Sequence, residues 1–261
     1  METASVKPYD RLWAALIFFT RLPLWRIHQP PSAAFQSVVE FWPLTGWLTA
    51  GVTAGVLYGA SLVLSYPIAI VLAIVSRMLL TGALHEDGLA DFADGFGGAG
   101  RDRQRILDIM KDSHIGTYGV LALIVYLALL FLALRSLAPA DAAFTILAVD
   151  PYAKLLSAQV VRFMPYARTA ATAKNRTVYR PLTAAALMGL ALQGLLPVAL
   201  YLWQMQGRVS CVLLLLLPCL LASLLCLLIW RRLRGYTGDC CGALFLLTEL
   251  TAYLVASHCL A

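Results

Sequence analysis

The sequence predicts an all-α, polytopic integral membrane protein with about seven transmembrane helices plus interfacial helices on the cytoplasmic side. Three observations favour this fold class. Hydrophobic residues make up 61% of the 261 residues and charged residues only 13%, whereas soluble domains have roughly 45–50% apolar and about 25% charged residues. The apolar residues form long runs, and the basic residues gather between alternate runs. We expect a single membrane-embedded domain, residues 1–261.

Residues 1–37, before the first long run, form a predicted interfacial segment. The stretch "RLWAALIFFTRLPLW" is too short to cross a bilayer. Trp13 and Trp25 are suited to the level of the lipid headgroups, where tryptophan is enriched. We therefore expect an amphipathic element that lies on the cytoplasmic surface of the membrane.

Seven apolar runs follow, each near the ~20 residues that a helix needs to cross the hydrocarbon core. They are residues 38–64, 66–84, 116–134, 142–163, 182–203, 209–230 and 240–260. If the N-terminus is cytoplasmic, sixteen of the twenty Lys and Arg residues fall on that side, as the positive-inside rule requires. The C-terminus is then outside. Topology accounts for the basic surplus, and no nucleic-acid partner is expected, because a basic stripe with interleaved aromatics is missing.

Ionisable residues inside the predicted spans need partners, because a charge is costly within the bilayer. Asp150 and Lys154 lie four residues apart and can neutralise each other. Arg77 and Glu249 both fall near the middle of the membrane, and we expect them to pair across helices. A homo-oligomer stays open, since lipid-facing and partner-facing helix sides look alike in a sequence.

The stretch "HEDGLADFADG" opens the cytoplasmic segment 85–115 and holds the candidate metal site. Asp87, Asp91 and Asp94 are separated by four and three residues, so a helix presents them on one face. Aligned carboxylates at a membrane edge repel one another unless a cation lies between them. Oxygen ligands favour Mg²⁺, or Mn²⁺, over zinc, and bound Mg²⁺ often contacts substrate phosphates as well. The alternative is a solvated charged face beside arginines.

His85 has three possible roles: metal ligand, general base or polar residue at a helix end. With no cysteine or second histidine at a suitable spacing, zinc ligation is disfavoured. An ordinary histidine pKa of about 6.5 suits proton transfer.

The stretch "RDRQRILDIMKDSHIGTYG" predicts a second polar helix, residues 102–113. Arg105 and Lys111 would hold phosphate, and Asp112 would contribute to the cation site. The alternative is an interfacial helix with internal ion pairs. Thr117, between two glycines at the start of the third span, suits an anion, because free N–H groups point outward from a helix N-terminus.

The last cytoplasmic segment, "RRLRGYTGDCCGA", places a similar turn at the start of the seventh span. Glycines and a basic triplet suit a phosphate-binding turn formed by Thr237, Gly238 and Asp239. The alternative is that Asp239 only caps the helix.

Five blocks of the sequence resemble the cobalamin synthases, the adenosylcobinamide-GDP ribazoletransferases. "TGALHEDGLADFADG" is similar to the family's H-x-D-G-x-x-D-x-x-D-G signature, "DIMKDSHIGTYG" to its I-M-[KR]-D-S-x-x-G-T-x-G block, and "TGDCCGA" to its T-G-D-x-x-G-A block. "FFTRLP" and "FWPLTG" resemble its N-terminal blocks. The family's glutamate ten residues after the T-G-D aspartate is Glu249 here, which we add to the candidate substrate-binding residues.

The resemblance implies a multi-pass enzyme of the bacterial inner membrane that requires Mg²⁺. It would join adenosylcobinamide-GDP to α-ribazole, or its 5′-phosphate, and release GMP. Asp87 and Asp91 would hold Mg²⁺, Asp94 would hold metal or take the hydroxyl proton, and His85 is the competing base. The remaining candidates would orient the diphosphate or nucleotide: Arg105, Lys111, Thr117, Thr237, Gly238 and Asp239.

The chain departs from the family pattern at two positions and leaves two rival functions. Arg234 stands where a glycine often precedes T-G-D, and Glu86 stands where leucine is common. A CDP-alcohol phosphotransferase is the nearest rival, but Asp91 occupies the position of its signature arginine. An ion-coupled transporter is the other, although no internal repeat is visible.

Overall fold

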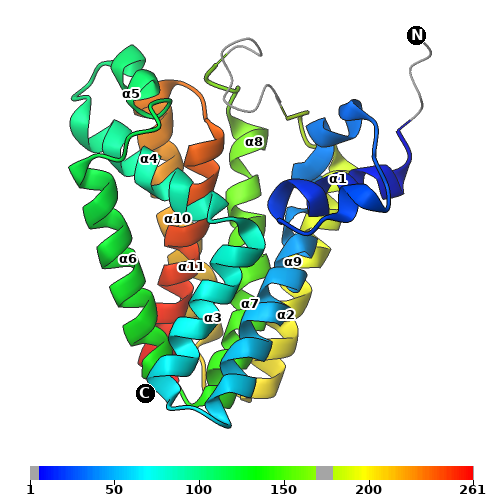
Figure 1. Cartoon of the computed structure of the whole chain (residues 1–261), viewed down its shortest axis with the longest axis vertical. Helices are drawn as coiled ribbons and strands as arrows, with labels where there is room; N and C mark the ends of the chain where they lie inside the picture. Colours follow the sequence, from blue (N-terminus) through cyan, green and yellow to red (C-terminus); the bar gives the residue numbers. More distant parts are fainter. Residues whose placement is uncertain (1–5, 169–178, 261) are drawn as a thin grey trace.

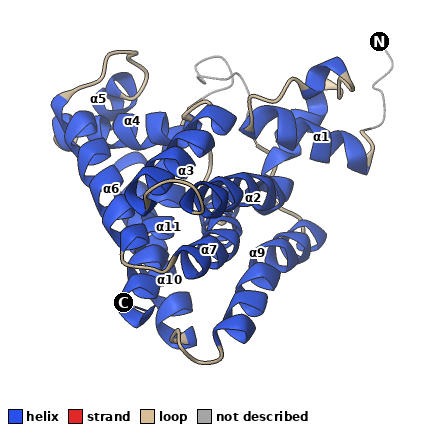
Figure 2. Ribbon diagram, turned by 60° about the horizontal axis from the view of Figure 1, so that its bottom comes forward, coloured by secondary structure: helices blue, strands red, loops and turns tan. Residues whose placement is uncertain are grey.

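The computed structural model describes residues 6–168 and 179–260, and the regular elements in these ranges are helices (Figure 2). The predicted all-α class is thereby confirmed. In chain order the elements are α1 Pro8–Phe19, η1 Leu24–Arg26, η2 Ser32–Phe41, α2 Trp42–Ser61, α3 Tyr66–Thr81, α4 Leu84–Gly98, α5 Arg103–Ile109, α6 Thr117–Arg135, α7 Pro139–Ala158, α8 Val160–Phe163, α9 Ala184–Met205, α10 Cys211–Leu233 and α11 Gly238–Leu260.

Four helices of the described chain are long and apolar enough to cross a membrane: α6, α9, α10 and α11. A fifth span exists if α3 and α4 count as one, but these helices are bent by 89°. The predicted number of seven is therefore not confirmed. The run predicted at 38–64 became α2, and the run at 142–163 became α7 and the short α8; α2 and α7 run along the bundle (Figure 1) but are not among the candidate spans. Glycine and threonine are frequent in α2, and α7 carries three charged residues.

The core of the bundle is α11, which packs on α4, α6, α7 and α10. In its most apolar window 78% of the residues are buried, against 22–28% in α6, α9 and α10. The other three helices therefore direct most of their apolar surface outward, as lipid-facing helices do. Beside this core α2 packs closely on α7. Glycine at position 46 permits this approach, because a Cβ atom there would lie 3.0 Å from the Pro151 Cα atom.

Both predicted pairings of buried charges are confirmed. The Nη1 group of Arg77 donates to both carboxylate oxygens of Glu249 at 2.7 Å, and its Nη2 group donates to the Tyr126 hydroxyl at 2.7 Å. On α7, Lys154 pairs with Asp150. A buried charge left without its partner costs several kcal/mol, so these contacts allow the charges inside the bundle.

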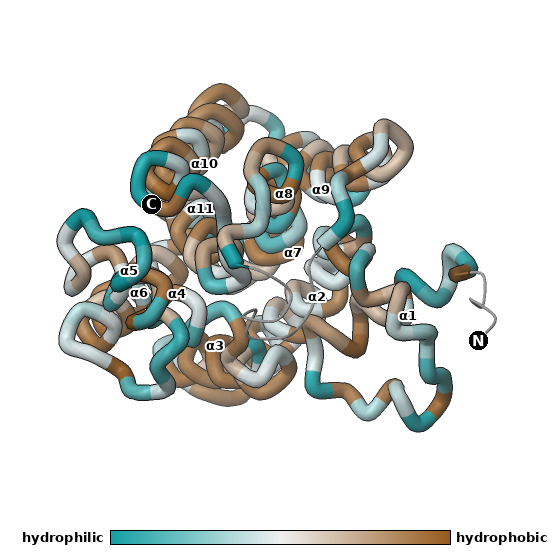
Figure 3. Tube along the Cα trace, turned by 90° about the horizontal axis from the view of Figure 1, so that it is seen from above, coloured by the Kyte–Doolittle hydropathy of each residue, from teal (hydrophilic) through white to brown (hydrophobic). Residues whose placement is uncertain are grey.

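The polar parts of the chain gather at one end of the bundle. There α1 and α4 lie across the ends of the long helices, with α5 beside them, while the C-terminus lies at the opposite end (Figure 1). Seen from above, hydrophilic residues concentrate on the loops of this end (Figure 3). Lys174 and Arg176, which the topology prediction assigns to the cytoplasmic side, lie outside the described residues.

A sharp elbow between α3 and α4 places the acidic helix across the bundle end. Gly82 ends α3 with φ 67°, and Ala83 follows with φ 55°, so two successive residues adopt the left-handed conformation. Glycine adopts this conformation freely, whereas alanine is strained there. The span was predicted to continue to residue 84, but the chain turns at residues 82 and 83 instead. The helix that follows, α4, carries the carboxylates that were predicted to lie on a helix.

Candidate active site

A cavity of about 120 Å³ lies where α1, η2 and the starts of α2, α4 and α11 converge. Residues on either side of the undescribed segment 169–178 complete it. Its polar and titratable lining residues are His85, Asp87, Tyr166, Arg168, Tyr179, Thr237, Asp239 and Cys241. The cavity therefore combines the two ends of the chain with a middle segment, residues 164–168 and 179–181.

The approach to α11 is built by an irregular turn after α10. Arg234 ends α10 with φ 52°, a left-handed conformation that glycine favours. The next residues pair with the middle segment: the Ala167 N–H donates to the Tyr236 carbonyl at 2.8 Å, and the Tyr236 N–H donates to the Pro165 carbonyl at 3.0 Å. The turn therefore forms with arginine at the position where the family often has glycine.

Thr237, Gly238 and Asp239 form the polar floor of the cavity. The Thr237 hydroxyl accepts a hydrogen bond from the Cys240 N–H at 3.3 Å, the geometry of an N-cap. Thr237 is buried, while Asp239 is half-buried. The cap leaves the first turn of α11 beside the cavity, where its N–H groups favour an anion.

Asp87 reaches the same cavity from α4 because the backbones of α4 and α11 touch. A side chain at Gly88 would lie 3.2 Å from the Cα atom of Asp239, and one at Gly242 would lie 3.1 Å from the His85 carbonyl oxygen. Glycine at these crossing points permits the contact. Two carboxylates that lie far apart in the sequence, Asp87 and Asp239, therefore line one cavity.

Asp94 has a different environment from Asp87, although both lie on α4. Its two carboxylate oxygens accept hydrogen bonds from the backbone N–H groups of Gly116 at 2.7 Å and Gly119 at 2.8 Å, at the start of α6. Side chains at either glycine would collide with this carboxylate. Asp94 is only 7% exposed and does not line the cavity. It therefore satisfies the N-terminus of α6.

The four predicted metal ligands do not form one group. Among the described residues, no three His, Cys, Asp or Glu side chains lie close enough to hold a metal ion. Asp94 contacts α6, and Asp91 is half-buried outside the cavity lining. Asp112 is exposed beside His114, whose hydrogen bonds to its carboxylate lower the pKa of Asp112.

The cavity nevertheless fits a hard cation. Asp87 and Asp239 supply carboxylate oxygens to the lining, and the Thr237 hydroxyl donates to the Asp239 carboxylate at 3.3 Å. Magnesium typically binds one or two carboxylates and takes its other ligands from water and substrate phosphates. The donor set that fits is thus Asp87 with Asp239, a combination that the spacing within α4 did not reveal.

The predicted substrate-binding residues divide into two groups. Arg105, Lys111 and Thr117 are exposed and do not line the cavity. Glu249 is 0% exposed and binds Arg77 inside the bundle. The residues of this prediction that do line the cavity are Thr237, Gly238 and Asp239.

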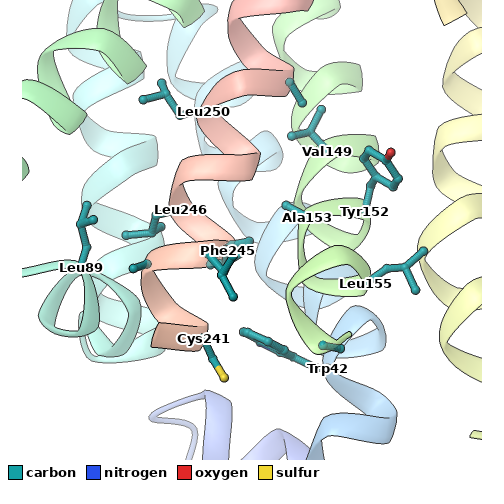
Figure 4. Close-up of a cluster of buried hydrophobic side chains, with 14 of the residues drawn as sticks. Trp42, Leu89, Val149, Tyr152, Ala153, Leu155, Cys241, Phe245, Leu246 and Leu250 are labelled. Carbon is teal, nitrogen blue, oxygen red and sulfur yellow. The ribbon is translucent and has the colours of Figure 1, made fainter. Parts of the chain in front are cut away.

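His85 lies at the cavity among aromatic rings. Its ring centroid is 4.6 Å from that of Phe245 and 6.0 Å from that of Trp42. Phe245 projects from α11 toward Trp42 at the start of α2 (Figure 4). In the described chain the Nε2 atom of His85 has no hydrogen-bond partner, although the residue is 3% exposed. Of the two predicted proton-transfer residues, His85 and Asp94, only His85 lines this cavity.

Several lining residues were absent from the predicted site. Phe18, Phe19 and Trp42 belong to the blocks "FFTRLP" and "FWPLTG". These blocks carried the family resemblance, and this signal was sufficient to select them. Tyr166 and Arg168 belong to the middle segment, in which no site residue was predicted.

The middle segment contributes hydrogen-bond donors. Burial raises the pKa of Tyr166 to about 12, and burial also raises the pKa of Tyr179 well above its ordinary value. Both phenols therefore stay protonated and able to donate near neutral pH. Arg168 donates to the Leu107 carbonyl at 2.7 Å, which fixes its guanidinium next to the cavity.

Comparison with known proteins places the chain in a family. Residues 11–257 match the family described as cobalamin-5-phosphate synthase. Relatives named adenosylcobinamide-GDP ribazoletransferase occur in Leptospira interrogans (32% identity, covering 94% of each chain), Vibrio cholerae (34%, covering 92% of this chain and 90% of the relative) and Pseudoalteromonas atlantica (36%, covering 95% and 90%). No solved structure matches the chain. The chain therefore belongs to the cobalamin-5-phosphate synthase family.

Proposed function

We propose that the chain transfers the adenosylcobinamide-phosphate group from adenosylcobinamide-GDP to α-ribazole, or its 5′-phosphate, and releases GMP. The observation that carries this proposal is the joint presence of Asp87, Asp239 and the start of α11 at one cavity. A diphosphate substrate requires charge compensation of this kind. The names of the relatives supply the substrates.

Asp87 and Asp239 would hold Mg²⁺. When bound, this ion neutralises diphosphate charge and stabilises the charge that develops on the leaving phosphate. The N–H groups at the start of α11 and the guanidinium of Arg168 favour the same anion. Thr237 would keep this turn in place through its cap.

The reaction needs one proton acceptor. The 3′-hydroxyl of ribazole would attack the phosphorus attached to the corrinoid linker. A new oxygen–phosphorus bond would form, the bond from that phosphorus to the bridging diphosphate oxygen would break, and the bridging oxygen would leave with GMP. The hydroxyl proton would pass to His85, a cavity-lining group able to accept it. A cavity of about 120 Å³ cannot enclose a corrin ring, so the corrinoid would remain outside, at the bundle end.

We infer that this end faces the cytoplasm of a bacterium, with the protein in the inner membrane. The strongly basic segments of the sequence adjoin the same end, as the positive-inside rule requires of cytoplasmic loops. Substrates that carry a nucleotide are also made in the cytoplasm.

The test uses purified protein in lipid nanodiscs, supplied with adenosylcobinamide-GDP and α-ribazole. We expect GMP release that requires both substrates and Mg²⁺, with the corrinoid product formed in equal amount. A CDP-alcohol donor serves as the comparison. Release of CMP from that donor, together with no release of GMP from the corrinoid donor, would overturn the proposal.

A further inference from the structure

The cavity has an aromatic side that the phosphate chemistry does not use. Phe19 and Trp42 are stacked, with centroids 5.3 Å apart and planes 8° apart. The His85 ring lies nearly parallel to both, at 9° to Phe19 and 15° to Trp42. These rings come from three elements, α1, α2 and α4. A set of near-parallel rings is suited to binding a flat, apolar ligand.

This side also contains polar ring atoms without partners. In the described chain neither the Trp42 Nε1–H nor the His85 Nε2 atom makes a hydrogen bond, although the residues are 2% and 3% exposed. Two other indoles are satisfied: Trp13 donates to the Leu24 carbonyl at 3.1 Å, and Trp47 donates to the Gln193 carbonyl at 2.8 Å. A buried tryptophan N–H usually finds an acceptor. The donor at Trp42 therefore points to an acceptor supplied by a ligand.

We infer that the aromatic side binds the base of the acceptor nucleoside, with the Trp42 Nε1–H donating to the unsubstituted ring nitrogen of a benzimidazole. This inference rests on the proposed function, which supplies two heterocycles, guanine and benzimidazole. Guanine carries several donors and acceptors along its edge, and each needs a partner when buried. A benzimidazole joined to ribose has one acceptor nitrogen, and the rest of its edge is hydrocarbon.

The composition of the lining selects between these bases. Beside the rings stand Val39 and Leu84, which offer only apolar surface. The indole N–H of Trp42 matches the one acceptor nitrogen, and Val39 and Leu84 match the hydrocarbon edge. Guanine would bury its amino and keto groups against Val39 and Leu84, which is unfavourable.

The subsite also orients the reaction. The aromatic side and the polar floor with Asp87 and Asp239 belong to one small cavity, and His85 is part of its lining. A nucleoside whose base lies against Trp42 has its ribose between the rings and the diphosphate. His85 is then close to the hydroxyl that loses its proton.

The test is a comparison of acceptors that differ in one atom. Trp42→Phe keeps an aromatic ring and removes the N–H, and an indole riboside replaces the acceptor nitrogen of benzimidazole riboside by a carbon. With wild-type protein we expect kcat/KM about tenfold higher for the benzimidazole riboside, the size of one buried hydrogen bond. Trp42→Phe should remove this preference, raise KM for α-ribazole about tenfold and leave KM for adenosylcobinamide-GDP unchanged.

Trp47→Phe is the matched control, because it removes an indole N–H on the same helix whose acceptor is known. We expect it to preserve the preference and both KM values. Equal kcat/KM for the two ribosides in the wild type would overturn the inference, whether or not Trp42→Phe folds. A higher KM for the corrinoid donor alone in Trp42→Phe would also overturn it and assign the cavity to guanine. In both cases GMP release by the wild type would still support the proposed function, which fails only if no GMP is released.

Discussion

The carboxylate of Asp94 accepts hydrogen bonds from two N–H groups at the start of α6, and this contact predicts how its variants behave. Asp94→Asn keeps one acceptor oxygen, so we expect it to destabilise the protein by about 1 kcal/mol, and Asp94→Ala by about 2 kcal/mol. Chemical unfolding in detergent micelles measures both. Asp108→Ala, an exposed site on α5, should change stability by less than about 0.5 kcal/mol. An Asp94→Asn variant of full stability that releases no GMP would instead indicate a metal or proton-transfer role.

Arg234 holds a left-handed conformation at the end of α10, where glycine is favoured. Arg234→Gly and Arg234→Ala both remove the guanidinium contact with the Trp230 ring, 5.6 Å from its centroid. Only the glycine variant removes the backbone strain. Arg234→Gly should therefore be more stable than Arg234→Ala by about 1 kcal/mol in the same unfolding measurement. Equal stability of the two variants would show that the turn has another conformation.

At the level of elements, the elbow between α3 and α4 determines where Asp87 lies. Ala83→Gly relieves a left-handed alanine, so we expect a gain of about 1 kcal/mol. Gly82→Ala adds the same strain and brings a methyl group against the Arg21 side chain, so we expect a loss of more than 1 kcal/mol and slower GMP release. Melting temperatures and initial rates distinguish the two variants. Changes of the same sign would contradict the described elbow.

Most helices could be predicted from the sequence because apolar runs determine them. The run at 116–134 became Thr117–Arg135, and the run at 240–260 became Gly238–Leu260. The elbow was missed because the apolar run continues through residues 82–84, and hydropathy carries no information on backbone angles. The number of spans is not confirmed for a similar reason, since helices rich in glycine or charge were counted together with the more apolar ones.

The candidate site was only partly predictable. Helical spacing places Asp87, Asp91 and Asp94 on one face of α4, but it cannot say which neighbour each carboxylate meets. Asp94 accepts hydrogen bonds from the start of α6, and the contact of α4 with α11 places Asp87 and Asp239 at the same cavity. Both contacts join different helices, and the second joins residues more than a hundred positions apart. The place of Trp42 at the aromatic side likewise depends on packing between separate elements.

The whole molecule places its N-terminal helix and its cavity at one end and its C-terminus at the other (Figure 1). We therefore expect a periplasmic reporter enzyme, such as alkaline phosphatase, to be active when fused after residue 260. The same reporter fused within residues 99–102, at the cavity end, should be inactive. Activity at residues 99–102 and none at the C-terminus would reverse the proposed orientation.

The central claim is that carboxylates from α4 and α11 act together on one magnesium-bound diphosphate. The most direct test is a double-mutant cycle on the rate of GMP release, with Asp87→Asn, Asp239→Asn and the double variant, and with Asp108→Asn as the control. Each single variant should lose about 10²–10³-fold in kcat. The double variant should lose little more than either one, because groups that act as a unit are not additive. Losses that multiply in the double variant, or single variants that match Asp108→Asn, would contradict the account.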